Sequence, residues 1–82
     1  ERLAIQPNPV TDGNLIIRLP QSWLDNPRGK VEFTILSATG SQVMTGGYTD
    51  LVNVSSLSPG FYILVLNNST NGLIASGKFI IR

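Results

Sequence analysis

Carboxylate side chains are the first candidates for chemistry in this 82-residue sequence, and there are five: Glu1, Asp12, Asp25, Glu32 and Asp50. Hydrolysis of a glycosidic bond needs two carboxylates held about 5–10 Å apart across a cleft. Asp12 and Asp25 lie in predicted turns, where aspartate is common because it hydrogen-bonds the local backbone. Glu32 alternates with apolar residues, which places it on the solvent face of a predicted strand. The sequence therefore predicts no catalytic acid pair.

The sequence contains neither histidine nor cysteine. Without histidine, none of the serines has the usual general base to activate it. Without cysteine, disulfides, thiolate metal sites and thiol catalysis are excluded. A calcium loop needs acidic oxygens at alternating positions, whereas the oxygen-rich stretch 67–71 carries only Asn, Ser and Thr. We therefore expect a domain that is not an enzyme and that binds no metal and no cofactor.

Charge and hydropathy further narrow the class of protein to which this chain can belong. The net charge is +1, and the six cationic residues are scattered along the chain, whereas a nucleic-acid surface needs a dense basic patch. No apolar run approaches the roughly 20 residues of a membrane helix. Charged residues make up only 13% of the chain, which favours an extracytoplasmic β domain. The chain begins without methionine, so we expect residues 1–82 to be one domain excised from a longer protein.

Short alternating segments separated by turn residues dominate the pattern, and no helical periodicity of useful length is present. This pattern predicts an all-β fold, an immunoglobulin-like antiparallel β-sandwich of about seven short strands. Gly46 and Gly47 are expected to end the fourth strand, and Trp23 is expected to cover an open end of the core. The predicted strands are residues 3–5, 15–19, 31–36, 42–45, 48–54, 61–66 and 73–82.

The segment 61–66 is the most apolar part of the chain, and both of its faces are apolar. Such a strand is expected in the middle of a sheet with a cover on each side. Pro59 and Gly60 precede it and predict a type II turn at residues 58–61. Tyr62 is expected to be a core aromatic whose hydroxyl reaches a backbone partner at a corner of the sandwich.

Turn chemistry marks several other positions. Asp12 and Gly13 predict a turn with a left-handed residue, and Gly40 is expected in the left-handed position of a second turn. Pro7 and Pro9 remove two amide donors, which places residues 6–10 at an edge or a corner and blunts edge-to-edge pairing.

Four motifs occur in one order along the chain. They are Pro7, Asn8, Pro9, Asp12 and Gly13; then Gly40; then Leu57, Pro59, Gly60 and Tyr62; and finally Lys78, Phe79, Ile80, Ile81 and Arg82. Together these motifs resemble the type A C-terminal sorting domain of the type IX (Por) secretion system of Bacteroidetes. The resemblance covers essentially the whole chain. It departs from the family at Gln6, where a tyrosine often stands, and in the longer segment 21–29.

The resemblance implies a non-catalytic secretion signal at the C-terminus of a secreted cargo protein. Such a domain directs its N-terminal cargo from the periplasm to the type IX outer-membrane machinery for translocation. It also implies removal of the signal by a sortase-like cysteine protease and anchoring of the cargo at the surface. The expected location is therefore secreted or cell-surface, reached through the periplasm and outer membrane.

The terminal segment is the expected recognition element, comprising Lys78, Phe79, Ile80, Ile81 and Arg82. Phe79 and Ile81 are expected to pack inward, whereas Lys78 and Arg82 are expected to be exposed. A terminal strand can also be captured by β-augmentation. Tyr62 could instead be read directly by the secretion machinery, but we favour its structural role in the core. The stretch from Pro7 to Pro9 is open between blunting an edge strand and marking where the domain detaches from its cargo.

A different class of function is an accessory carbohydrate-binding or adhesion module on the same fold. It would need an exposed aromatic platform, for which Trp23 and Tyr48 are the candidates. Exposed edge strands would in addition allow two copies to pair as a homodimer.

Overall fold

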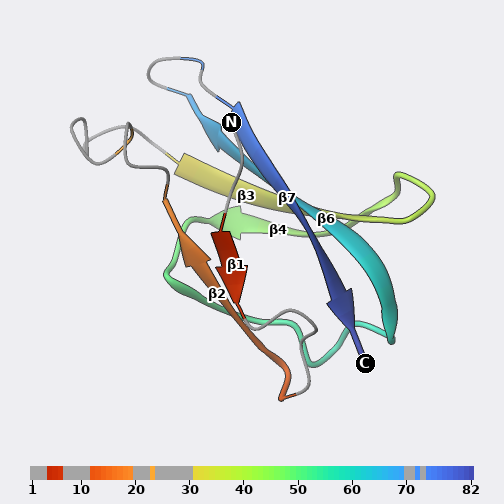
Figure 1. Ribbon diagram of the computed structural model, residues 1–82. Helices are drawn as coiled ribbons and strands as arrows, with labels where there is room; N and C mark the ends of the chain where they lie inside the picture. The colour runs from red at the N-terminus through yellow and green to blue at the C-terminus, as the bar shows by residue number, and fades with distance from the viewer. Residues whose placement is uncertain (1–3, 7–11, 20–22, 24–30, 70–71, 73) are drawn as a thin grey trace.

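The computed structural model in Figure 1 describes residues 4–6, 12–19, 23, 31–69, 72 and 74–82. Each described strand pairs in antiparallel fashion, and the strands form one sheet in the order β1-β2-β5 and another in the order β4-β3-β6-β7. The strands are β1 (Ala4–Gln6), β2 (Asn14–Arg18), β3 (Val31–Ser37), β4 (Gln42–Gly47), β5 (Leu51–Asn53), β6 (Gly60–Asn68) and β7 (Ile74–Ile81). The predicted all-β architecture is thereby confirmed.

The two sheets lie as layers with their apolar faces together (Figure 1). The first, second and fifth strands share one layer, and the third, sixth and seventh share the other with β4 at its edge. This alternation of strands between layers is typical of immunoglobulin-like sandwiches. It confirms the immunoglobulin-like sandwich predicted from the spacing of strands and turns.

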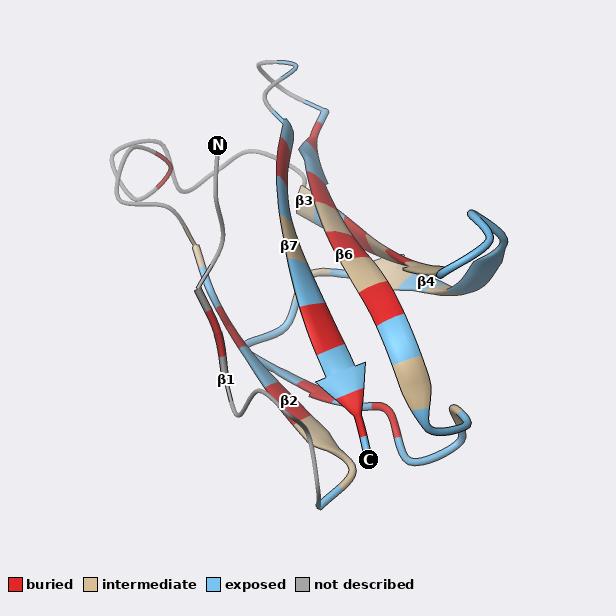
Figure 2. Ribbon diagram, turned by 45° about the vertical axis from the view of Figure 1, so that its right-hand side comes forward, coloured by how far each residue is buried: buried red, intermediate tan, exposed pale blue. Residues whose placement is uncertain are grey.

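The core consists of the alternate side chains that each sheet turns inward, as the red bands along the strands show in Figure 2. Period-two alternation places these residues on one face of each strand. The buried apolar residues are Ile5, Leu15, Ile17, Trp23, Phe33, Ile35, Val52, Val54, Tyr62, Leu64, Leu66, Ala75, Phe79 and Ile81. Trp23 is only 2% exposed and belongs to this cluster, as expected of a residue that covers the core. The residues on either side of Trp23, 20–22 and 24–30, lie outside the described residues.

The fourth strand is longer than predicted. It continues through Gly46 and Gly47, which pair with Phe33 and Glu32. A side-chain Cβ at Gly46 would lie 3.1 Å from Cε2 of Phe33, so the phenyl ring occupies the space that the glycine leaves open. Packing against an aromatic ring across the strands compensates for the missing side chain. The prediction that the two glycines break this strand is wrong for that reason.

The predicted strand at residues 48–54 is shorter in the structure, because the chain changes sheets there. The backbone N–H of Tyr48 donates to the carbonyl oxygen of Val31 in the four-stranded sheet, at 2.9 Å. Two residues later, the carbonyl oxygen of Asp50 accepts a hydrogen bond from the N–H of Ile17 in the three-stranded sheet, also at 2.9 Å. Only Leu51–Asn53 remain as β5. A strand that crosses between packed sheets in this way forms a corner of the sandwich.

The sixth strand lies in the middle of its sheet, between β3 and β7, as predicted. Its inner face, which carries Tyr62, Leu64 and Leu66, is buried. Its outer face is not covered: Phe61 is 40% exposed, and Ile63 and Val65 are half-buried. The expectation of a cover on each side is therefore wrong for the outer face, since the second sheet packs against one side only.

Candidate functional site

The seventh strand presents alternate side chains to the core and to solvent. Phe79 and Ile81 are buried, whereas Lys78, Ile80 and Arg82 are exposed. Figure 2 shows the same alternation as red and pale blue bands along β7. The predicted inward and outward orientations of this segment are thus confirmed. Among the five residues expected to be recognised, only the three exposed ones offer their side chains to a partner.

Phe79 is held in place by a neighbour on the adjacent strand. It stands opposite Tyr62 in the register of β6 and β7. The two rings stack with centroids 5.7 Å apart and planes inclined by 22°. An aromatic pair of this kind stabilises a sheet beyond the area it buries. Phe79 therefore anchors the terminal strand to the centre of the sheet.

Tyr62 also closes the corner where the chain enters the sixth strand. Its hydroxyl donates a hydrogen bond to the carbonyl oxygen of Ser58, at 2.6 Å. A tyrosine near the start of this strand that bonds backward to the backbone is a tyrosine corner, a known feature of immunoglobulin-like sandwiches. The backbone partner predicted for the hydroxyl is confirmed. These contacts favour a structural role for Tyr62.

The turn before β6 differs from the expected type II turn. The third residue of that turn type has φ near +80°, whereas Gly60 has φ of 156°. Gly60 pairs with Ile81 as the first residue of β6, and its backbone is therefore nearly extended. Leu57 packs half-buried against the core, and Pro59 is exposed. The motif therefore shapes the start of a strand, and the prediction of a type II turn is wrong.

The first turn motif brings two distant segments together. Gly13 has φ of 81°, and Asp12 Oδ1 accepts a hydrogen bond from the N–H of Asn14 at 3.0 Å. The carbonyl oxygen of Gly13 accepts from the N–H of Val54 at 2.8 Å, and a Cβ at Gly13 would lie 3.0 Å from Cβ of Ser55. The predicted left-handed turn is confirmed, and its glycine is also required by close packing.

The hairpin between β3 and β4 contains the second predicted glycine. Gly40 has φ of 89°, as expected, and its N–H donates to the carbonyl oxygen of Ser37 at 2.9 Å. No atom lies within 4 Å of where a Cβ would stand, so only the backbone conformation requires glycine. Pro7, Asn8 and Pro9 lie outside the described residues, and their roles stay predictions.

Tyr48 ties the two sheets together at the crossover, a role that the sequence did not reveal. Its hydroxyl is 2.8 Å from Asp50 Oδ1 and 3.1 Å from the carbonyl oxygen of Ile17, and it can donate to either. Burial, together with the hydrogen bond and the negative charge of Asp50, raises the pKa of Tyr48 to about 12. The spacing Tyr48-x-Asp50 at the end of a strand was the available signal.

Among the described residues, Trp23 and Tyr48 do not form an exposed aromatic platform. Trp23 is buried in the core, and Tyr48 packs half-buried against the core with its hydroxyl directed to Ile17 and Asp50. The alternative of a carbohydrate-binding or adhesion module therefore loses both residues on which it depended. Within the described part of the chain, no group of three or more acidic residues could hold a metal ion. Among the same residues, no helix is long and apolar enough to cross a membrane.

The strand β4, at the edge of the four-stranded sheet, is a candidate for the edge-to-edge pairing expected in a homodimer. Its six residues include no charged residue and no proline, the features that usually protect an edge from pairing. Its pairing partner among the described strands is β3. Pairing of two copies through an edge strand stays a prediction.

Two comparisons with known proteins place the chain. The family described as "Secretion system C-terminal sorting domain" matches residues 4–82. Among solved structures, PorZ, an essential bacterial surface component of the type-IX secretion system of human oral-microbiomic Porphyromonas gingivalis, is similar with a TM-score of 0.70 and 14% sequence identity. That similarity covers 98% of this chain and 11% of the PorZ chain, and at this identity it shows a shared fold. A comparison with curated proteins finds no match.

The family match spans nearly the whole chain, and it includes the corner at Tyr62, the turns at Gly13 and Gly40 and the terminal strand. The sandwich fold agrees with that of the solved structure. This chain therefore belongs to the C-terminal sorting domains of the type IX secretion system.

Proposed function

We propose that this domain is a non-catalytic signal that delivers the cargo protein attached to its N-terminus to the type IX outer-membrane machinery for translocation. The observation that carries the proposal is the family match over residues 4–82. The chemistry of export then belongs to the machinery, and the domain contributes a folded surface.

The exposed side chains of β7 are the proposed point of recognition. Lys78, Ile80 and Arg82 alternate along its solvent face, and Phe79 and Ile81 fix the strand to the core between them. A machine that reads this segment in the folded domain therefore contacts two cations and one apolar side chain. Removal of the domain by a sortase-like cysteine protease and anchoring of the cargo to an anionic lipopolysaccharide complete the proposed route.

Secretion of a full-length cargo in a bacterium with type IX machinery tests the signal role. Cargo that lacks residues 4–82 is expected to accumulate in the periplasm. Cargo in which Lys78, Ile80 and Arg82 are all changed to alanine should be retained too, with the domain still folded. Arg18→Ala is the matched control, because it removes an exposed cation from the opposite sheet. Normal export without residues 4–82 would overturn the proposal.

Deletion of the terminal residues alone is a poor test of recognition. Phe79 is fully buried and stacks on Tyr62, so a truncation from this residue onward removes part of the core. Loss of a buried phenylalanine typically costs about 3–5 kcal/mol, which is a large share of the stability of a small domain. Substitutions at the exposed positions separate recognition from folding.

The proposed cleavage has its own readout. The mass of the secreted cargo should lack residues 4–82, and inactivation of the protease should leave them attached. Cargo that keeps the domain on the cell surface of the normal strain would contradict cleavage but leave the signal role standing.

A further inference from the structure

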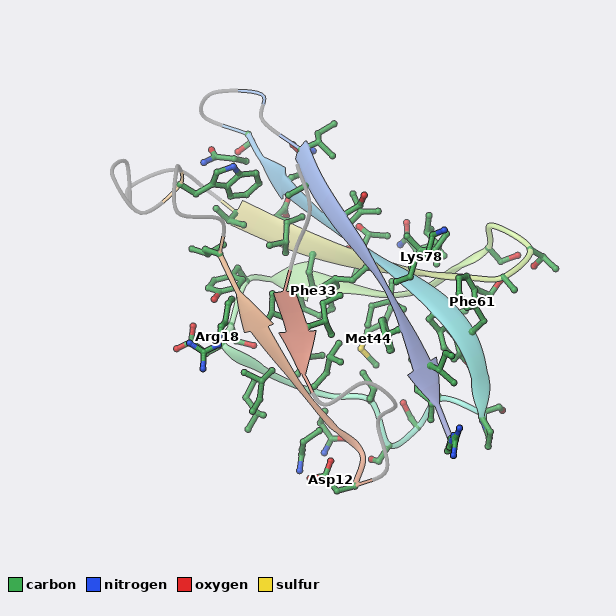
Figure 3. All side chains as sticks on the ribbon, in the orientation of Figure 1. Asp12, Arg18, Phe33, Met44, Phe61 and Lys78 are labelled. Atoms are coloured by element: carbon green, nitrogen blue, oxygen red, sulfur yellow. The ribbon has the colours of Figure 1, made fainter. Side chains whose placement is uncertain are left out.

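The outer face of the four-stranded sheet carries a contiguous apolar patch. Phe61 stands opposite Ile80 in the register of β6 and β7, and Ile63 stands opposite Leu36 on β3. Val65 follows Ile63 in the same phase along β6. We call these residues the outer patch: Leu36, Phe61, Ile63, Val65 and Ile80. They share the face of the sheet that points away from the second layer, where Figure 3 shows the side chains of Phe61 and Lys78.

This patch departs from the usual pattern of a solvated sheet. An antiparallel sheet packed on one side normally alternates between apolar residues inside and polar residues outside. At the far end of the same face the rule holds for Glu32, which stands opposite Asn67, but not for Ile74 of β7, which also pairs with Asn67 and is 59% exposed. It also fails where Phe61 is 40% and Ile80 is 44% exposed as direct neighbours. A contiguous exposed apolar area of this kind marks an interaction surface.

Cations border the patch on one side. Lys78 stands opposite Ile63, and Arg82 follows Lys78 in the same phase beyond Ile80, both with exposed side chains. The described acidic residue on this face is Glu32, four residues before Leu36 along β3 and therefore at the opposite end of the sheet. A complementary partner would place apolar side chains on the patch and carboxylates beside Lys78 and Arg82.

We propose that the outer patch is a docking surface for an apolar, carboxylate-bearing protein surface of the outer-membrane secretion machinery. This inference rests on the proposed function and extends recognition from the terminal strand across β6 to β3. A lipid surface fits the same face less well, because recognition of anionic lipid usually needs clusters of 4–8 basic residues, and the described residues of this face include two. A protein partner needs only a few apolar anchors with complementary charge at the rim.

The test compares two double variants of the full-length cargo. Phe61→Ser with Ile63→Thr alters the patch but leaves the terminal strand intact. Ile16→Thr with Leu51→Ser is the matched control, because these residues form an exposed apolar pair on the outer face of the other sheet, 41% and 55% exposed. The patch variant should lower the secreted fraction about tenfold or more, and the control should leave it within about twofold. Thermal unfolding of both variants must remain cooperative, with similar midpoints.

Substitutions that change the charge at Lys78 are the second part of the test. Lys78→Glu should reduce secretion severalfold, and Lys78→Arg should retain it, because the partner's carboxylates require a cation. A photo-crosslinking amino acid in place of Phe61 should form an adduct with an outer-membrane protein next to acidic residues, and one in place of Leu51 should not. Equal secretion of the Lys78→Glu and Lys78→Arg variants would overturn the proposed partner chemistry.

The outcomes distinguish this inference from the function on which it rests. Loss of export on removal of residues 4–82, together with normal export of the folded patch variant, would overturn the docking surface and leave the signal role intact. Normal export without residues 4–82 would overturn both. Binding of the wild-type cargo to phosphatidylcholine–phosphatidylglycerol vesicles, abolished in the patch variant, would assign the surface to lipid and refute the protein partner.

Discussion

Tyr62→Phe tests whether the corner motif acts through the fold or as a recognised epitope. The substitution removes only the hydroxyl that donates to the carbonyl oxygen of Ser58 at 2.6 Å. The ring remains, and with it the stack on Phe79 at 5.7 Å. The variant therefore tests the hydroxyl group alone, and its effects on folding and on recognition can be measured separately.

The expected loss in the free energy of unfolding depends on the surroundings of the Tyr62 hydroxyl and the Ser58 carbonyl oxygen. A net hydrogen bond contributes about 0.5–1.5 kcal/mol, and an acceptor left buried without a partner raises the cost further. Ser58 is exposed, so water can reach its carbonyl oxygen once the hydroxyl is gone. We therefore expect a loss of about 1 kcal/mol, which lowers the melting temperature of a domain of this size by about 4–8 °C.

Thermal unfolding and secretion of the same variant provide the assay. Tyr62→Phe should melt several degrees lower and still be exported at normal levels, since most molecules remain folded. Tyr62→Ala also removes the stacked ring, and at about 3–5 kcal/mol it should prevent folding and export together. An unchanged melting temperature would refute the energetic role of the corner. Failed export of a folded Tyr62→Phe variant would refute the structural interpretation and identify the hydroxyl as a contact of the machinery.

Three further predictions follow from single positions. Gly13→Ala and Gly40→Ala both force alanine into left-handed backbone, at about 1–2 kcal/mol each, but the close packing at Gly13 should make its melting temperature fall further. Equal midpoints would contradict that packing. Stability should decline as the pH rises from 10 to about 12, because the folded chain keeps the Tyr48 proton, with its raised pKa, where the unfolded chain has lost it. Urea titrations should show a smaller decline for Tyr48→Phe, and identical slopes would argue against the shift. Phe79→Ala should abolish cooperative unfolding, whereas Ile80→Ala, at an exposed position, should change stability by about 0.5 kcal/mol and still reduce secretion. A folded Phe79→Ala variant would contradict the anchoring role.

Local chemistry made two of the turns and the faces of the terminal strand predictable. Glycine at positions 13 and 40 was expected in left-handed backbone because other residues avoid it, and both have positive φ. The alternation at residues 78–82 correctly predicted which side chains of β7 lie inside. The fold class followed from the spacing of such segments, since short strands separated by turns leave few other ways to bury their apolar faces.

The predictions that were wrong concern segments whose structure depends on contacts with residues distant in the sequence. Gly46 was expected to end a strand, but the ring of Phe33 from the facing strand fills its place. Most residues of the segment 48–54 favour strands, and only its hydrogen bonds to Val31 and Ile17 show that it crosses between sheets. Type II geometry at Gly60 was overridden by pairing with Ile81. Local preference is weak where a tertiary partner competes with it.

The sixth strand shows why an apolar pattern alone could not locate the surface. Both of its faces are apolar, and the sequence therefore predicted that both would be buried, as is usual for a central strand. The structure uses one face, with Tyr62 and Leu64, to hold the sheets together and leaves the other, with Phe61 and Ile63, facing out. Substitutions on the inner face should then act on export through folding, with parallel losses in melting temperature. Substitutions on the outer face should act at constant stability, and this difference separates a structural motif from a recognition surface on a single strand.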